Sequence, residues 1–373
     1  MATHKQGITA WHDLDANPGY RWRGKNEDRL SSEAALDRLQ SHKILVPKTS
    51  FKLNLSRSSH VYAAGSCFAR NIEDELIAAG VNMLSKITTA SLSDQIGRRP
   101  NAFLNRYNTA SLAQEFRSAF NSNIPLDSLI VRLGEDNAID LSLCQLPYQP
   151  ISIVKQLRGA TSRSFASAAH ADLLILTLGV NEVWRDRKTG SWLNITPPRQ
   201  LVGAMPNRFE VLELSPQDNF NLIQEAVELV RQARNTCIPV VLTVSPVPLE
   251  ATFFGECVIS QTFKGKSILR SAAAMACDSI ENVHYFPSYE AAMVSADSLT
   301  WDEDRRHPTS LFVSTVVREF LVRQGLRPAS KTGLAQDGST ENDHDEIILL
   351  KRHIKRLNME VSRLNYQLIN RKD

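Results

Sequence analysis

Three short motifs in the chain carry residue types that can form and stabilise a covalent acyl intermediate. The first, Gly65-Ser66-Cys67-Phe68-Ala69, places a small nucleophile between an apolar segment and a helix-like segment. The second, Leu178-Gly179-Val180-Asn181-Glu182, ends another apolar segment. The third, Asp304-Arg305-Arg306-His307-Pro308, places a carboxylate three residues before an imidazole. Serine, asparagine, aspartate and histidine are the types that nucleophilic catalysis with a proton relay requires.

Each of these residues has a predicted role. Ser66 can attack a carbonyl carbon, because the positive end of the following helix stabilises negative charge there. The Ser66 N–H and the Asn181 side-chain amide can donate to the oxyanion, and Gly179 permits close approach. His307 can take the serine proton, while Asp304 accepts the other ring N–H and fixes the tautomer. Each motif also has an ordinary interpretation: a serine at a helix start is most often a cap, and Asn and Gly are common turn residues.

Cys67 competes with Ser66 for the role of nucleophile. A thiol is intrinsically the better nucleophile, and a helix start would lower its pKa. If Ser66 points into a cleft, however, the next residue points elsewhere, so we favour Ser66 as the catalytic residue. Three other histidines lie in or beside apolar segments and are expected to be structural: His60, His170 and His284.

Four residues near the motifs are predicted to contact substrate. Asn105 and Asn108 form a polar stretch that can supply a contact at the site. Glu182 is expected to hold Asn181 or the following loop rather than to react. Trp184, like Trp192 and Trp301, can stack on a sugar face or serve only in packing.

Short apolar runs alternate with longer helical segments, and this alternation must position the motifs. Four runs are apolar almost throughout, which indicates strands covered on both faces and therefore a parallel sheet: 60–65, 172–178, 238–244 and 283–286. Helices are expected near 68–80, 109–120, 154–169, 218–235, 263–279 and 309–324, the last beginning at about Pro308. The fold class is therefore α/β, a three-layer α/β/α sandwich with a mostly parallel sheet and ligands at the carboxyl ends of the strands.

Several segments lie outside this alternation. Residues 1–50 are expected to be an extension that packs on the main domain, residues 51–326, with partial disorder of the extension as the alternative. Residues 129–141 predict a hairpin that turns at 134–137, and residues 185–214 predict an irregular flap.

The end of the chain has a different composition. Residues 327–345 are polar, as in a flexible linker. Residues 346–373 carry a heptad pattern with β-branched residues at most a positions and Leu at d, which favours a parallel two-stranded coiled coil and a homodimer through residues 346–370. The alternative is an amphipathic helix that folds back on its own domain. The a positions are Ile347, Ile354, Val361 and Leu368, and the d positions are Leu350, Leu357 and Leu364.

Composition limits the classes of function. Hydrophobic residues are 42% and charged residues 22%, as in ordinary globular proteins, and the net charge of +3 gives no reason to expect nucleic acid as a partner. No apolar run reaches the roughly 18 residues of a membrane span, and the first residues lack a secretory pattern, which predicts a cytoplasmic protein. The five cysteines include no C-x-x-C pair, so neither a disulfide framework nor a zinc site is expected. We expect no cofactor and no metal.

The motifs together resemble those of a known family. Their order, Ser, Asn, Asp, His, is similar to the sequence blocks of SGNH hydrolases, with Glu182 in place of an aspartate. The pentapeptide Gly65–Ala69 is the one that gives the GSCFA family its name. The resemblance covers about residues 50–325 and includes four supporting segments: 107–109, 177–179, 244–248 and 285–290. No residue is assigned as the counterpart of the glycine in the second SGNH block, which leaves the oxyanion hole partly assigned.

This resemblance implies acyl-ester chemistry, by hydrolysis or by transfer. The expected substrate is a carbohydrate or small-molecule ester with an O-acyl group such as acetyl. The alternative is a catalytically silent binding module that the coiled coil brings together as a dimer.

Overall fold

The structure is a computed structural model that describes residues 5–23, 34–53, 55–87, 101–121, 129–144, 148–255 and 257–326. The chain divides into two compact units, residues 1–328 and 329–373, and every described residue belongs to the first. The predicted linker at 327–345 and coiled coil at 346–373 lie outside the described residues. The coil and the homodimer therefore stay predictions.

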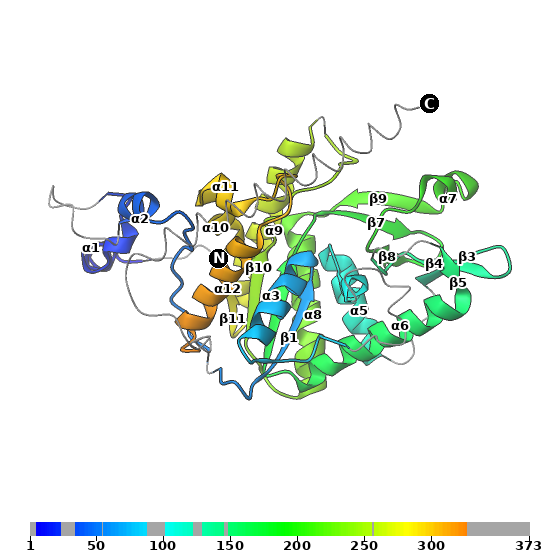
Figure 1. Ribbon diagram of the computed structural model, residues 1–373, viewed down its shortest axis with the longest axis horizontal. Coiled ribbons are helices and arrows are strands. Elements are labelled where there is room, and N and C mark those ends of the chain that lie inside the picture. Colours follow the sequence, from blue (N-terminus) through cyan, green and yellow to red (C-terminus); the bar gives the residue numbers. More distant parts are fainter. Residues whose placement is uncertain are drawn as a thin grey trace, which may run out of the picture. The chain divides into compact units, whose positions relative to one another are not determined.

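A five-stranded sheet forms the centre of the first unit (Figure 1). Its order is β11-β10-β6-β1-β2, and every pairing in it is parallel. The strands are β1 (His60–Gly65), β2 (Asn82–Met83), β6 (Leu173–Leu178), β10 (Val240–Val244) and β11 (Val283–Tyr285). The predicted α/β class with a parallel sheet is confirmed, and the short edge strand β2 is an addition to the four predicted strands.

Helices cover both faces of this sheet because its strands are apolar on both sides. In β1, Val61 and Ala63 join one core cluster, whereas Tyr62 and Ala64 join the other. The Val61 face packs on α3 (Cys67–Ala78), α10 (Ser288–Val294) and α12 (Ser310–Arg323). The Tyr62 face packs on α5 (Thr109–Phe120), α6 (Ile151–Ala166), α8 (Pro216–Arg234) and α9 (Val258–Ser279). The result is a helix–sheet–helix arrangement.

Three helices begin at other residues than predicted, and the first of them, α6, begins at Ile151 rather than near 154. Helix α9 begins at Val258 rather than near 263. Helix α12 begins at Ser310, because Thr309 is its cap and accepts a hydrogen bond from the Phe312 N–H at 3.0 Å. Pro308 lies before the cap and pairs with Trp301 in an isolated bridge. His307 accordingly lies in a loop that this bridge holds in place before α12 begins.

The two insertions form small antiparallel sheets. The predicted hairpin is present as β3 (Ile130–Leu133) and β4 (Asn137–Asp140), with β5 (Gln149–Pro150) as a third strand. The prediction of an irregular flap at 185–214 was wrong. That region contributes to a sheet of order β8-β7-β9, with β7 (Glu182–Asp186), β8 (Ser191–Leu193) and β9 (Phe209–Glu213), and a helix, α7 (Arg199–Ala204). Its apolar side chains, among them Leu193 and Leu201, pack in one cluster with Val131, Ile139 and Leu141 from the hairpin region.

The segment before β1 contacts the main domain through backbone groups. The Arg323 guanidinium donates to the carbonyls of Val46 (3.0 Å) and Pro47 (2.6 Å), and the Leu53 N–H donates to Gln324 Oε1 (2.6 Å). Residues 46–53 therefore lie along the end of α12. The two short helices before them are α1 (Gly7–Ala16) and α2 (Ala35–Ser41).

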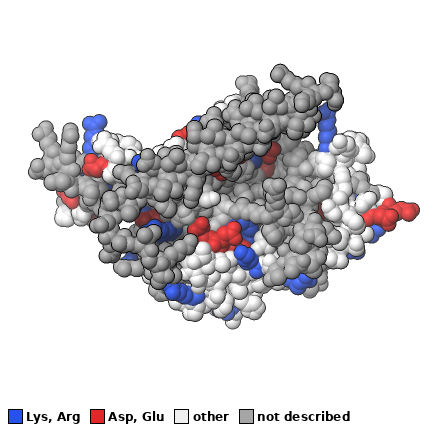
Figure 2. All heavy atoms as spheres, viewed as in Figure 1, with Lys and Arg blue, Asp and Glu red and all other residues white. Residues whose placement is uncertain are grey.

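The surface carries both signs of charge. In Figure 2, basic and acidic side chains both occur among the described atoms of the visible face. Within the described residues, no helix combines the length and the apolar character that a membrane crossing requires.

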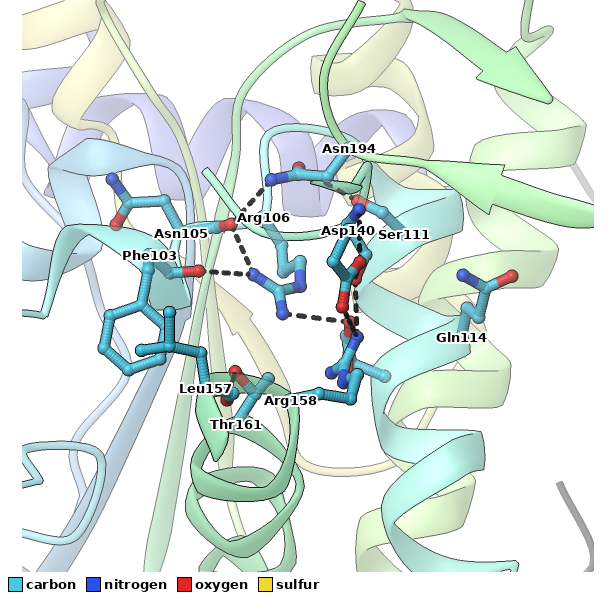
Figure 3. A network of polar contacts seen from close by, with 12 residues as sticks. Phe103, Asn105, Arg106, Ser111, Gln114, Asp140, Leu157, Arg158, Thr161 and Asn194 are labelled. Carbon is cyan, nitrogen blue, oxygen red and sulfur yellow. Dashed lines mark hydrogen bonds and ion pairs between the residues drawn. The ribbon is translucent and has the colours of Figure 1, made fainter. Parts of the chain in front are cut away.

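A buried ion cluster joins α5 and α6 to the loop between residues 104 and 109 (Figure 3). Glu115 pairs with Arg106 at 2.9 Å and with Arg158, and Arg158 reaches Asp140 at 3.4 Å. All four side chains are at most 1% exposed. Burial alone would raise the pKa of Glu115, but the two guanidinium groups outweigh it and hold the pKa below its ordinary value. Arg106 also donates to the Asn105 carbonyl at 2.7 Å, so the cluster fixes the loop beside it.

We expect Glu115→Ala to lower the free energy of unfolding by about 3–5 kcal/mol, because it leaves Arg106 buried without a carboxylate and Arg158 with Asp140 alone. The control is Glu225→Ala, which removes a carboxylate from a pair with Arg117 that is about one-third exposed. That change should cost about 1 kcal/mol or less. Denaturant unfolding of both variants measures the difference, and equal losses would contradict it.

Candidate active site

The first and second motifs follow neighbouring strands of the central sheet. Ser66 follows β1 and Gly179 follows β6, and the two strands end level because Gly65 pairs with Thr177. The strand order also reverses between them, since β2 lies beyond β1 on one side and β10 and β11 lie beyond β6 on the other. The crevice at such a reversal is the usual ligand position in open parallel sheets.

Gly179 lies in close contact with two other segments. A Cβ atom at Gly179 would come within 2.5 Å of the Tyr107 carbonyl oxygen and 3.1 Å of the Ser66 Cβ. The Val180 N–H donates to the same Tyr107 carbonyl at 2.7 Å, and the Arg106 N–H donates to the Gly65 carbonyl at 2.6 Å. The loop at 105–108 thus bridges the ends of β1 and β6.

The Ser66 hydroxyl is held at the start of α3. Its Oγ accepts from the Phe68 N–H at 3.3 Å and lies 3.1 Å from Thr177 Oγ1, and the residue is 2% exposed. The Ser66 N–H donates to the Thr177 carbonyl at 3.1 Å. That N–H is therefore occupied, which corrects its predicted role as an oxyanion donor. Gly65 is required next to it, because its φ is +120° and a Cβ would lie 2.1 Å from the Thr177 oxygen.

Asn181 has a buried amide whose orientation is determined by Asn219. Asn219 Nδ2 donates to the Ser215 carbonyl at 2.9 Å, and a carbonyl can only accept, so the same NH₂ group must face Asn181. Asn181 consequently presents Oδ1 to it at 2.8 Å. The Asn181 Nδ2 is left with no partner among the described residues. An unpaired donor of this kind suits a site where negative charge develops.

Asp304 and His307 form a hydrogen-bonded pair. His307 Nδ1 lies 2.5 Å from Asp304 Oδ2, and Asp304 Oδ1 accepts from the His307 and Arg306 N–H groups at 2.9 Å. The hydrogen bonds from His307 hold the pKa of Asp304 at about 2. The carboxylate is thus ionised at neutral pH and can orient an imidazole that is about half exposed.

The family model described as the GSCFA family matches residues 60–320, which include all three motifs. The chain belongs to the GSCFA family. No curated protein matches it significantly.

In this GSCFA protein the first two motifs touch, whereas the third makes no hydrogen bond to Ser66 within the described part of the chain. A link between them runs through Lys266, whose Nζ donates to the Gly179 carbonyl at 2.7 Å. The Arg306 guanidinium, next to His307, lowers the pKa of Lys266, so the two cations are near one another. Catalytic hydrogen bonds are often long without substrate and tighten when it binds. The role of His307 stays a prediction.

The four predicted substrate contacts differ in availability. Asn105 Oδ1 is buried and has no partner among the described residues. Asn108 caps α5, accepting from the Ser111 N–H at 2.7 Å and donating to the Leu193 carbonyl at 3.0 Å, so both ends of its amide are occupied. The Glu182 carboxylate accepts from Thr252 Oγ1 and the Phe253 N–H and holds the loop after β10. Two members of this set have an unused polar atom within the described residues: Asn105, and Trp184, whose indole Nε1 is also buried without a partner.

The three tryptophans have packing partners. Trp184 meets the ring of Phe253 edge-on at 5.0 Å, and Phe253 is itself 49% exposed. Trp192 lies under the Arg185 guanidinium. Trp301 packs against the cluster that contains α12. Phe253 is the exposed ring of this pair, whereas Trp184 has intermediate exposure.

Cys67 lies at the first residue of α3 with intermediate exposure. A negative charge on the Cys67 thiolate would raise the pKa of Tyr107, Cys144 and Lys266. These three groups therefore lie near Cys67. The Tyr107 hydroxyl and Cys144 Sγ are 2.8 Å apart. Cys67 thus faces a mostly buried group of polar side chains.

Two residues of this site were missed by sequence reasoning. Asn219 and Lys266 lie within α8 and α9, where no motif distinguishes them from other helical positions. Only the packing of these helices on the Gly179–Asn181 segment gives them a role.

We expect Gly179→Ala to be destabilising by about 1–3 kcal/mol, because the new methyl group would overlap the Tyr107 carbonyl. Gly159→Ala is the matched control, since its Cβ would meet nothing nearer than Arg163 Nη1 at 3.4 Å. Within the interior of α6 that change should stabilise by up to about 1 kcal/mol. Thermal and denaturant unfolding show whether each change raises or lowers the free energy of unfolding. Stabilisation by both changes would refute the close contact.

Proposed function

We propose that this GSCFA protein is a serine-dependent acyl-ester hydrolase or O-acyltransferase with an SGNH-like site. The observation that carries the proposal is the contact of Gly179 with Ser66 at the strand-order reversal, beside the unpaired Asn181 amide. Nucleophile, oxyanion donor and close-packed glycine are then adjacent. The Asp304–His307 pair supplies a base whose tautomer is fixed.

In the proposed mechanism His307 takes the proton from Ser66 Oγ as that oxygen bonds to the ester carbonyl carbon. The carbonyl oxygen becomes an oxyanion, which accepts from Asn181 Nδ2 and from the Gly179 N–H. Collapse expels the alcohol, which takes the proton from His307, and leaves an acyl group on Ser66. Water or a sugar hydroxyl then attacks the acyl-enzyme by the same steps in reverse.

A carbohydrate O-acyl ester is the substrate we propose. Trp184 and Phe253 offer aromatic surface close to Glu182, and sugars stack on such rings. The cytoplasmic location and the homodimer through residues 346–370 stay predictions beside this proposal.

A specific observation favours a second candidate, a catalytically silent binding module. Ser66 is 2% exposed and its hydroxyl already caps α3. A serine with only this role would leave the crevice as a binding site without chemistry.

We expect Ser66→Ala and His307→Ala each to lower turnover of p-nitrophenyl acetate by at least about 10³-fold, and the double change to cost little more, because such residues act as a unit. Cys67→Ala is the control and should retain most activity. Turnover in Ser66→Ala together with loss in Cys67→Ala would identify the thiol as the nucleophile. A wild type that neither turns over the ester nor reacts with a fluorophosphonate probe would favour the binding module.

The Asp304–His307 pair also predicts how stability depends on pH. The pKa of Asp304 is about 2 in the folded chain against an ordinary value of 3.8. The ionised carboxylate therefore stabilises the fold above about pH 4, and this contribution is lost as the pH falls through 2. Asp304→Asn should be less stable than wild type at pH 5–7, and the difference should vanish near pH 2. Urea unfolding across this range measures it.

The control for that experiment is the same substitution in a His307→Ala background. Its effect at pH 5–7 should be smaller, because the partner is already absent. An equal effect in both backgrounds would show that the pair does not carry the stability.

A further inference from the structure

Lys266 is an unusual residue for its position. It lies on the inner face of α9 and is 2% exposed. Its Nζ donates to the Gly179 carbonyl at 2.7 Å, and within the described residues no carboxylate lies within ion-pair distance of it. Lysines are almost never fully buried without a pairing partner, because removing an ammonium from water is costly.

Among the described residues, no carboxylate compensates the charge of Lys266. The pKa of Lys266 is lowered to about 7, mainly by burial and to a smaller extent by the Arg306 guanidinium, against a raising effect that a charge on Cys67 would have. Arg306 lies in the loop before α12 and Cys67 at the start of α3. Glu182 lines the same pocket, but its carboxylate is engaged by Thr252 and Phe253.

From the other packed elements, α8, β10 and β11, no titratable group perturbs Lys266. Glu213, on β9, is bound by Gln261 and Lys264 of the same helix. Within the part of the chain that the structure describes, the Lys266 ammonium therefore has no carboxylate as a counter-charge at the wall of the candidate active site.

Helix α9 also fixes the Gly179–Asn181 segment. The peptide between Gly179 and Val180 is held at both ends, its carbonyl by Lys266 and its N–H by the Tyr107 carbonyl. Gly265, next to Lys266, packs closely on Asn181. A Cβ atom at Gly265 would lie 3.4 Å from the Asn181 Cβ. The pocket between this segment and α9 is small, about 10 Å³, which is roughly the room that one water molecule needs.

We propose that Lys266 is a positioning residue of the acyl-transfer site: its ammonium holds the Gly179–Asn181 segment against Ser66, and its uncompensated positive charge stabilises the oxyanion formed there. The inference rests on the proposed function. A charged donor makes a stronger hydrogen bond than a neutral amine, and a charge in a water-poor wall acts over a longer range than one in solvent. Fixed positive charge aimed at developing negative charge is the largest contribution in many acyl-transfer sites.

A pH dependence follows from the sign of this charge. The ammonium is present below the pKa of Lys266 and is lost as the pH rises through about 7. His307 must be neutral to act as a base, which raises turnover with pH. Turnover by wild type should therefore pass through a maximum, with Lys266 responsible for the alkaline decline.

The test uses the full chain as wild type, Lys266→Arg, Lys266→Met and Lys264→Met, with p-nitrophenyl acetate from pH 5.5 to 9. Lys266→Met should fold, because replacing a buried charge by an apolar side chain is often neutral or stabilising. Its kcat should fall about 10–100-fold with little change in KM, and its alkaline decline should disappear. Lys266→Arg keeps a permanent charge, so it should restore most of kcat and shift the decline to higher pH. The exposed control Lys264→Met should behave as wild type.

The outcomes separate the two proposals. A wild type without ester turnover and without fluorophosphonate labelling refutes the proposed function and this inference with it. An active wild type whose kcat and alkaline decline are unchanged in Lys266→Met refutes the inference alone. If Lys266→Met does not fold, the profile of Lys266→Arg decides, and an alkaline decline identical to that of wild type overturns the proposal.

Discussion

The candidate site depends on the absence of a side chain at Gly179. Ser66 and the Tyr107 carbonyl occupy the space that a Cβ would need, so three chain segments meet there at van der Waals distance. The hydrogen bonds from Val180 to Tyr107 and from Arg106 to Gly65 can form only at this separation. Because β1 and β6 are adjacent strands on either side of the order reversal, the contact also sets the position of Ser66 relative to the Asn181 amide.

Two buried sets of charges support this contact in opposite ways. The cluster of Arg106, Glu115, Arg158 and Asp140 contains both signs, so its members satisfy one another and hold the loop at 105–108 rigidly. Lys266 has no such partner among the described residues and donates to a backbone carbonyl instead. A cluster in which opposite charges pair fixes the position of the loop. An ammonium without a carboxylate partner also produces a positive electrostatic potential around it. The protein places the first behind the loop and the second behind Gly179, where negative charge is proposed to form.

The sequence predicts the sheet well because its signal is local. Runs such as 173–178 are apolar on both faces, and only a strand covered by helices on both sides needs that pattern. The region at 185–214 was misread because prolines and charged residues interrupt its alternation, and its strands are stabilised by pairing with β7 rather than by their own composition. The start of α12 was misplaced because a proline suggested the first helical residue, while the hydroxyl of the next residue, Thr309, provides the cap.

The residues of the candidate site also divide into those that the sequence reveals and those that only the structure reveals. Ser66, Asn181, Asp304 and His307 lie in loops beside strands or helices, where the residue type and the spacing point to a role. Asn219 and Lys266 lie inside long helices, and their types alone would suggest a solvated position. Their roles come from contacts over large sequence separations, Asn219 with Asn181 and Lys266 with Gly179. Contacts of this kind leave no periodic pattern in the chain, so the residues that orient a site are harder to find from sequence than the residues that would react in it.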